Sequence, residues 1–278
     1  MIPASFEYER PGSLDEALGL LAEHGDEAKV LAGGHSLLPL MKLRFATPAV
    51  VIDIGRLDSL SYVRDEGDHV AVGALTSHRE VARAELLRRH VPLLAHAAGQ
   101  VGDPQVRQRG TLGGSLAHGD PASDLPAVAL ALGATFVVDG PQGRRELAGD
   151  DFFEGFLETA LTPEELLVEV RVPKVDGVGW SFQKLTKRAQ DWAIVGAAVL
   201  HGNGRAGVGL INMGATPIRA LDVESALRAG ASAADAAALA DVGTEPTADL
   251  NADETFRRHL ARVLVRRGIE EAAAGSSR

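Results

Sequence analysis

Cysteine is absent from the 278-residue sequence, and this absence removes several kinds of site at once. Without thiolates the chain cannot bind an iron–sulfur cluster or a thiolate-held zinc ion, and it cannot form a disulfide. The nine histidines are scattered, without an HExxH motif or a close pair on one helical face. The sequence therefore predicts no metal site.

Long apolar runs and a basic surface are missing as well. No apolar run reaches the ~18 residues of a membrane span, and the first residues lack the basic-then-apolar order of a signal peptide. We therefore expect no transmembrane segment and a cytoplasmic location. The formal net charge is −10, whereas nucleic-acid binding requires clustered Lys and Arg. We expect no nucleic-acid partner.

The composition is typical of a chain with a packed core, with 45% hydrophobic and 24% charged residues. A helix is predicted from Ser13, which forms a capping pair with Glu16, to Gly25. Apolar runs predict buried strands at 29–34 and 49–55. Together these elements predict a βαβ-like lobe over residues 1–55.

A second lobe is predicted over residues 56–174. It contains two strands joined through Gly67, a helix that starts at the capping pair Ser77 and Glu80, and an alternating strand that ends at Pro173. The pattern then changes to three strand-like runs and Ala-rich helices. We therefore predict one domain over 1–174 and a smaller one over 175–278, a three-stranded antiparallel sheet with a helical bundle. Asn203-Gly204 predicts a hairpin in that sheet.

Two glycine segments share a short sequence pattern, Gly-Gly followed closely by a serine: AGGHSL at 32–37 and LGGSLA at 112–117. Adjacent glycines let the backbone approach a ligand because no Cβ intervenes, and successive N–H groups can bind an anion. A helix that starts near Ser36 would direct its N-terminal dipole at the same anion. Two such segments can hold a pyrophosphate between them.

The alternative for either segment alone is a structural turn, because the chain has 31 glycines. Neither segment matches a P-loop or a Rossmann fingerprint. We interpret residues 111–127 as one long loop, and Asp124 near its end can accept hydrogen bonds from ribose hydroxyls. The alternative role of Asp124 is to cap the helix that follows.

The segments LAGGHSLLPLMKLR and TLGGSLAHGDPASDLPA together resemble the FAD-binding medium subunits of molybdenum hydroxylases, the family of the carbon monoxide dehydrogenase medium subunit and the xanthine dehydrogenase FAD domain. The resemblance covers the whole chain. It implies an α+β fold: a two-part FAD-binding domain of the vanillyl-alcohol-oxidase-like type, followed by a smaller domain of antiparallel sheet plus helices.

The resemblance also implies site residues. The two glycine segments would clamp the FAD pyrophosphate, Asp124 would lie near the ribose, and Leu167 and Lys184 would contact the flavin. Trp192 is the candidate aromatic residue at the flavin ring, with Trp180 as the alternative. The pyrophosphate residues are Ala32, Gly33, Gly34, His35, Ser36 and Leu37 in the first segment, and Thr111, Leu112, Gly113, Gly114 and Ser115 in the second.

The function implied is electron transfer within an oxidoreductase. In this family a molybdopterin large subunit oxidises the substrate, a 2Fe-2S small subunit relays the electrons, and the FAD subunit releases them. The absence of cysteine allows this chain only the last role, without catalytic residues of its own for an organic substrate. The resemblance further implies a dimer of heterotrimers. Substrate and electron acceptor stay open.

Two other functions fit part of the sequence. A stand-alone flavoprotein oxidase of the same fold would act directly on an alcohol or sugar, and the GGHS spelling also occurs in oxidases whose histidine bonds covalently to the flavin. We expect non-covalent FAD instead, because the turn that carries His35 should face the pyrophosphate. A nucleotide-binding sensor without redox chemistry is the other alternative.

Overall fold

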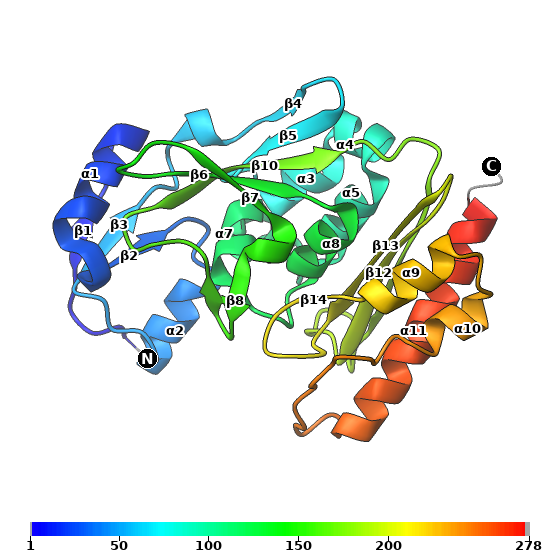
Figure 1. Cartoon of the computed structure of the whole chain (residues 1–278). Coiled ribbons are helices and arrows are strands. Elements are labelled where there is room, and N and C mark those ends of the chain that lie inside the picture. Colours follow the sequence, from blue (N-terminus) through cyan, green and yellow to red (C-terminus); the bar gives the residue numbers. More distant parts are fainter. Residues whose placement is uncertain (1, 276–278) are drawn as a thin grey trace.

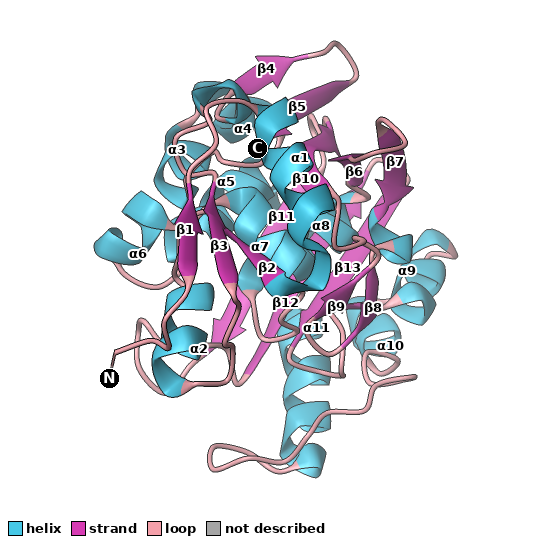
Figure 2. Cartoon of the chain, turned by 90° about the vertical axis from the view of Figure 1, so that its left-hand side faces the viewer, coloured by secondary structure: helices cyan, strands magenta, loops and turns pink. Residues whose placement is uncertain are grey.

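The computed structural model describes residues 2–275, so residues 276–278 of the predicted C-terminal domain lie outside the described residues. A small parallel sheet of strand order β1-β3-β2 forms the first lobe. Figure 2 shows its strands side by side. The elements of this lobe are β1 (Glu7–Glu9), α1 (Leu14–His24), η1 (Gly25–Glu27), β2 (Ala28–Leu31), α2 (Leu37–Leu43) and β3 (Val50–Asp53). The sequence did not predict β1, because three residues reading Glu-Tyr-Glu carry no apolar alternation.

The start of α1 differs in one detail from the predicted capping pair. The Ser13 hydroxyl accepts a hydrogen bond from the Glu16 N–H at 3.1 Å, as expected. The Glu16 carboxylate, however, accepts from the Gly12 N–H at 2.6 Å rather than from Ser13. At α3 the pair is complete, because Ser77 and Glu80 satisfy each other's backbone N–H groups.

A five-stranded antiparallel sheet of order β4-β5-β10-β6-β7 forms the centre of the second lobe. Its strands are β4 (Val63–Asp65), β5 (His69–Gly73), β6 (Thr135–Asp139), β7 (Arg145–Ala148) and β10 (Leu166–Pro173). Helices follow β5 and cover one face of the sheet (Figure 1): α3 (His78–Arg83), α4 (Glu85–His90), α5 (Pro92–Gln100), α6 (Pro104–Arg109), α7 (Leu112–His118) and α8 (Asp124–Leu132). Shorter elements are η2 (Asp58–Leu60), η3 (Gly149–Asp151), β8 (Phe153–Gly155) and β9 (Glu158–Thr159).

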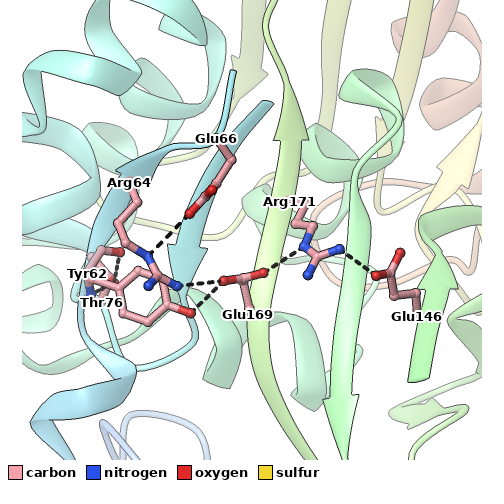
Figure 3. Close-up of polar contacts among 7 residues, drawn as sticks. All are labelled: Tyr62, Arg64, Glu66, Thr76, Glu146, Glu169 and Arg171. Carbon is pink, nitrogen blue, oxygen red and sulfur yellow. Dashed lines mark hydrogen bonds and ion pairs between the residues drawn. The ribbon is translucent and has the colours of Figure 1, made fainter. Parts of the chain in front are cut away.

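A charged network joins three strands of this sheet (Figure 3). The Glu169 carboxylate accepts hydrogen bonds from the Tyr62 hydroxyl at 2.7 Å and from Arg171 at 2.7 Å. Arg64, on β4, forms an ion pair with Glu169, and Arg171 forms an ion pair with Glu146 on β7. Burial, together with the hydrogen bond to Glu169, raises the pKa of Tyr62 to about 12. The network therefore holds β4, β10 and β7 in register without any ligand.

The C-terminal sheet has four antiparallel strands rather than the predicted three: β11 (Gly179–Leu185), β12 (Val195–Gly202), β13 (Arg205–Ile211) and β14 (Ile218–Arg219). The sequence missed β14 because two residues cannot show an alternating pattern. The Asn203-Gly204 hairpin is confirmed, with φ of +50° and +74°. Three helices follow, with α11 packed on β11 and β12: α9 (Leu221–Arg228), α10 (Ala233–Ala237) and α11 (Glu254–Gly275).

Close packing of α8 on β13 joins the two parts of the chain. A Cβ at Gly207 would lie 2.0 Å from the Ala131 carbonyl oxygen, and one at Gly209 would lie 1.9 Å from that of Ala127. Only glycine permits this approach of strand to helix. The result is four layers, in the order sheet, helices, sheet, helices (Figure 1). At its start, α8 also contacts β11 through the side chains of Asp124 and Lys184.

No helix within residues 2–275 is long and apolar enough to cross a membrane.

Candidate functional site

A cavity of about 750 Å³ lies where the first lobe, the helix layer and the C-terminal sheet meet. Ligand pockets span roughly 300–1,000 Å³, so this volume suits a large cofactor. Every residue predicted to bind the cofactor lines this cavity except Leu112. The structure thus brings together residues that are far apart in the sequence, from Ala32 to Trp192.

The first glycine segment forms the tight turn between β2 and α2. Gly34 has φ +75°, a left-handed conformation that favours glycine. A Cβ at Gly33 would lie 2.2 Å from the Arg109 carbonyl oxygen, so this turn packs directly on the backbone that leads into the second segment. Helix α2 starts at Leu37, as expected from the sequence.

The second glycine segment is not the long loop that we expected. Residues Leu112–His118 form helix α7, and only 119–123 connect it to α8. Thr111 caps α7, its hydroxyl accepting a hydrogen bond from the Gly114 N–H at 3.1 Å. Glycines disfavour a helix by about 1 kcal/mol each, which is why the sequence favoured a loop. Capping and tertiary packing override that preference here.

The packing of α7 gives its residues different roles. Leu112, predicted from the sequence as one of the pyrophosphate residues, is instead buried in the core and does not line the cavity. Leu112 and Leu116, four residues apart, share the buried face of the helix.

The two glycines of α7 have different surroundings. A Cβ at Gly113 would lie 2.5 Å from the Ala74 Cβ, so packing alone requires glycine there. Gly114 lines the cavity, and a Cβ there would be 3.8 Å from the Ala32 Cβ. The two glycine segments therefore adjoin at Ala32 and Gly114.

Asp124 and Lys184 form a buried ion pair across the two parts of the chain. The Lys184 Nζ lies 2.8 Å from Asp124 Oδ2, and the Asp124 side chain is only 5% exposed. Burial raises the pKa of Asp124, and the charge of Lys184 opposes this rise. The other oxygen, Oδ1, is buried without a hydrogen-bond partner among the described residues. Ser123 occupies the N-cap position of α8 and Asp124 the first helical position, so the alternative capping role does not apply.

The structure separates the two tryptophans that the sequence left open. Trp192 lines the cavity and is 59% exposed. Trp180 lies elsewhere, with its ring 5.2 Å from that of His96 at the edge of the helix layer. Leu167 reaches the cavity wall from β10 beside a register shift between Leu167 and Glu169.

Among the cavity residues that the sequence did not predict, His78 and Leu157 stand out. His78 lines the cavity, is 4% exposed, and has an Nδ1 atom without a partner among residues 2–275. Leu157, between β8 and β9, lines it with φ +59°. Neither residue carries a local signal, since a histidine after a capping serine and a leucine in a hairpin are common. Only the long-range contacts place them here.

His78 makes stability depend on pH. Burial, together with the smaller effect of the charges of His35 and Arg107, lowers the pKa of His78 to about 4. Between pH 6.5 and 4 the unfolded state binds a proton that the folded state does not, so the free energy of unfolding falls as the pH falls. From pH 7 to pH 5 we expect His78 to contribute about 2 kcal/mol of this fall.

Urea unfolding of the FAD-free chain at pH 7 and pH 5 measures the effect. His78→Gln should lose most of this part of the pH dependence, while the same change at the exposed His259 should keep it. An unchanged difference between the two pH values in His78→Gln would contradict the assignment.

Comparison with known proteins places the chain in a family. Residues 4–175 match the family described as the FAD binding domain in molybdopterin dehydrogenase. Residues 180–272 match the CO dehydrogenase flavoprotein C-terminal domain. The fold thus belongs to a class of FAD-binding proteins, and the expected α+β architecture is confirmed.

Individual relatives match this chain over nearly the full length of both sequences. The carbon monoxide dehydrogenase medium chain of Hydrogenophaga pseudoflava is 43% identical, with 99% of each chain covered. The caffeine dehydrogenase subunit beta of Pseudomonas sp. (strain CBB1) is 40% identical, over 98% of this chain and 96% of that one. The solved carbon monoxide dehydrogenase from H. pseudoflava matches with a TM-score of 0.95 over 99% of both chains, and quinoline 2-oxidoreductase from Pseudomonas putida 86 matches with 0.92 at 32% identity over 100% of both.

The chain belongs to the family of FAD-binding medium subunits of carbon monoxide dehydrogenase-type molybdenum hydroxylases. It is an oxidoreductase subunit, and its cofactor is FAD.

Proposed function

We propose that this chain is the electron-transfer subunit of a heterotrimeric molybdenum hydroxylase. It takes electrons from the iron–sulfur clusters of a partner subunit and passes them to an external acceptor. The observation that carries the proposal is a cavity suited to FAD in a chain without any cysteine. Such a chain can carry the flavin but cannot ligate the clusters that feed it.

The residues present fit FAD. The turn at 32–36 and the start of α7 both line the cavity and turn glycine backbone toward it, which is where we assign the pyrophosphate. The unpartnered Asp124 Oδ1 is an acceptor that a ribose hydroxyl can satisfy. We assign Lys184, Leu167 and the exposed Trp192 to the flavin end.

FAD, when bound, supplies redox chemistry that accepts single electrons and passes on a pair. The chain's own residues bind and orient the cofactor. The Asp124–Lys184 pair keeps a cation and a carboxylate at fixed positions on the cavity wall. Trp192 forms part of the wall that meets solvent. We assign no catalytic residue toward an organic substrate.

The names of the relatives support the proposal that this chain works with partner subunits. They are named medium chain, subunit beta and FAD-subunit, and their enzymes are named for substrates as different as caffeine and nicotinate. Substrates so unlike each other indicate that the substrate pocket lies outside this subunit. The proposed partners are a molybdopterin large subunit and a 2Fe-2S small subunit, assembled as a dimer of heterotrimers in the cytoplasm.

Purification of the affinity-tagged chain from its native host tests this function. We expect two further polypeptides in equal amount, together with molybdenum, iron and FAD, and we expect the isolated chain to turn over no organic substrate. Robust oxidation of an alcohol or sugar by the pure chain, without partners, would overturn the proposal in favour of a stand-alone flavoprotein oxidase.

Because the GGHS motif also occurs in oxidases with covalently bound flavin, the mode of FAD attachment is a separate test. His35 lies in the same turn as Gly33 and Gly34, which we assign to the pyrophosphate. We therefore expect acid precipitation to leave the yellow colour in the supernatant. His35→Ala should weaken FAD binding only about tenfold, since the backbone N–H groups remain. A yellow pellet that yields a flavin-bearing peptide with His35 would contradict this.

A further inference from the structure

Asn212, directly after β13, contacts two segments that each carry a cavity residue, although Asn212 itself does not line the cavity. Its φ is +62°, a left-handed conformation that asparagine tolerates better than other residues with a side chain. Its backbone and its side-chain amide donate to carbonyl groups from different parts of the chain. None of the patterns in the sequence pointed to this residue.

The backbone of Asn212 holds the connection between α7 and α8. Its N–H donates to the Pro121 carbonyl at 2.8 Å. Pro121 is buried and lies three residues before Asp124. This hydrogen bond therefore fixes the segment that leads into the buried ion pair.

The side chain of Asn212 holds the segment that carries Trp192. Its Nδ2 donates to the carbonyl groups of Ala193 at 2.9 Å and Ile194 at 3.3 Å. The fully buried Arg257 donates to the same Ile194 carbonyl and pairs with Asp249 at 2.8 Å. Both carbonyls that follow Trp192 are thus fixed, although the Trp192 ring itself is exposed.

We infer that Asn212 is a positioning residue of the flavin site, which holds the Trp192 wall against the wall that carries Asp124. The inference rests on the proposed FAD site. A left-handed backbone and an amide donor are both required at this position. Glycine supplies the backbone but no donor, and aspartate supplies the shape but places an oxygen against two carbonyl oxygens.

Asn203 offers a matched control. It also has positive φ, at +50°, and its Nδ2 donates to the Gly177 carbonyl at 2.8 Å. The strand pairing places Gly196 beside Ile211 and Gly202 beside Arg205, so Asn203 lies at the opposite end of β12 from Asn212. Asn203→Gly therefore removes the same kind of bond far from the cavity.

The experiment compares Asn212→Gly with Asn203→Gly in the full chain. We measure FAD affinity by titration and, without FAD, acrylamide quenching of Trp192 in a Trp180→Phe background. We expect Asn212→Gly to bind FAD roughly tenfold more weakly, the effect of two ordinary hydrogen bonds, and to expose Trp192 to more quenching. Asn203→Gly should change neither quantity.

The outcomes separate this inference from the proposed function. Equal FAD affinity and equal quenching in the two variants would overturn the positioning role. A chain that binds no FAD even without these substitutions would overturn the proposed function, while the quenching comparison would still test Asn212. If Asn212→Gly does not fold, Asn212→Asp replaces it, with the same shifts expected and the same result overturning the inference.

Discussion

Gly114→Val is expected to abolish tight FAD binding and to leave the chain folded. A Cβ at Gly114 would lie 2.7 Å from the Thr111 Oγ1 atom and 3.8 Å from the Ala32 Cβ. The valine side chain would therefore enter the space between the two glycine segments, where we place the pyrophosphate. The Thr111 side chain can rotate away, which loses its N-cap hydrogen bond at a cost of about 1 kcal/mol, a loss that the fold survives. We expect FAD affinity to fall by about 100-fold or more, roughly 3 kcal/mol.

FAD titration followed by flavin fluorescence measures this loss. Gly19→Val is the matched control, because Gly19 is an exposed glycine in α1 with nothing within 4 Å of its added Cβ. Both variants place valine in a helix, so they share its modest helix propensity. Full FAD occupancy in Gly114→Val would show that the cofactor phosphates lie elsewhere.

Lys184→Met is expected to destabilise the FAD-free chain by about 3–5 kcal/mol. The substitution leaves the carboxylate of Asp124 buried without its cation. Removal of one partner of a buried pair costs far more than removal of both. The double variant Asp124→Asn with Lys184→Met should therefore recover most of the lost free energy of unfolding, measured in urea at pH 7.

The pH dependence follows from the raised pKa of Asp124. A carboxyl group whose pKa is higher in the folded state than in the unfolded state holds its proton longer when folded, so stability falls as the pH rises through that window. Without the opposing charge of Lys184, the pKa of Asp124 rises further. The stability of Lys184→Met should therefore fall as the pH is raised above about 4, and the double variant should not show this fall.

Lys174→Met provides the control for Lys184→Met. Lys174 pairs with Asp65 at 2.6 Å, but the Asp65 side chain is 44% exposed. Water can replace the lost cation there, so we expect little change in stability. Equal destabilisation by the two lysine variants would mean that burial of Asp124 does not govern the energetics of this pair.

The two glycine segments show where sequence reasoning held and where it failed. Their proximity to each other follows from the family pattern, and the structure brings them together at Ala32 and Gly114. The helical state of Leu112–His118 was not predictable, because glycine propensity favours a loop. The contact of Gly113 with Ala74, which requires both a helix and a glycine, involves a residue about 40 positions away.

The sequence by itself determined the secondary elements with strong periodic or turn signals, the family, and the exclusion of cluster ligands. These depend on composition and local spacing, as in the Asn203-Gly204 hairpin and the Ser77–Glu80 capping box. Only the tertiary structure decided that Asp124 pairs with Lys184 and that Trp192 rather than Trp180 lines the cavity. It also placed His78 in the cavity wall and Asn212 against the segment that follows Trp192. The physical reason is that each of these facts depends on how α8 packs against the C-terminal sheet or how separate segments meet at the cavity, and no local pattern encodes contacts between residues so far apart in the chain.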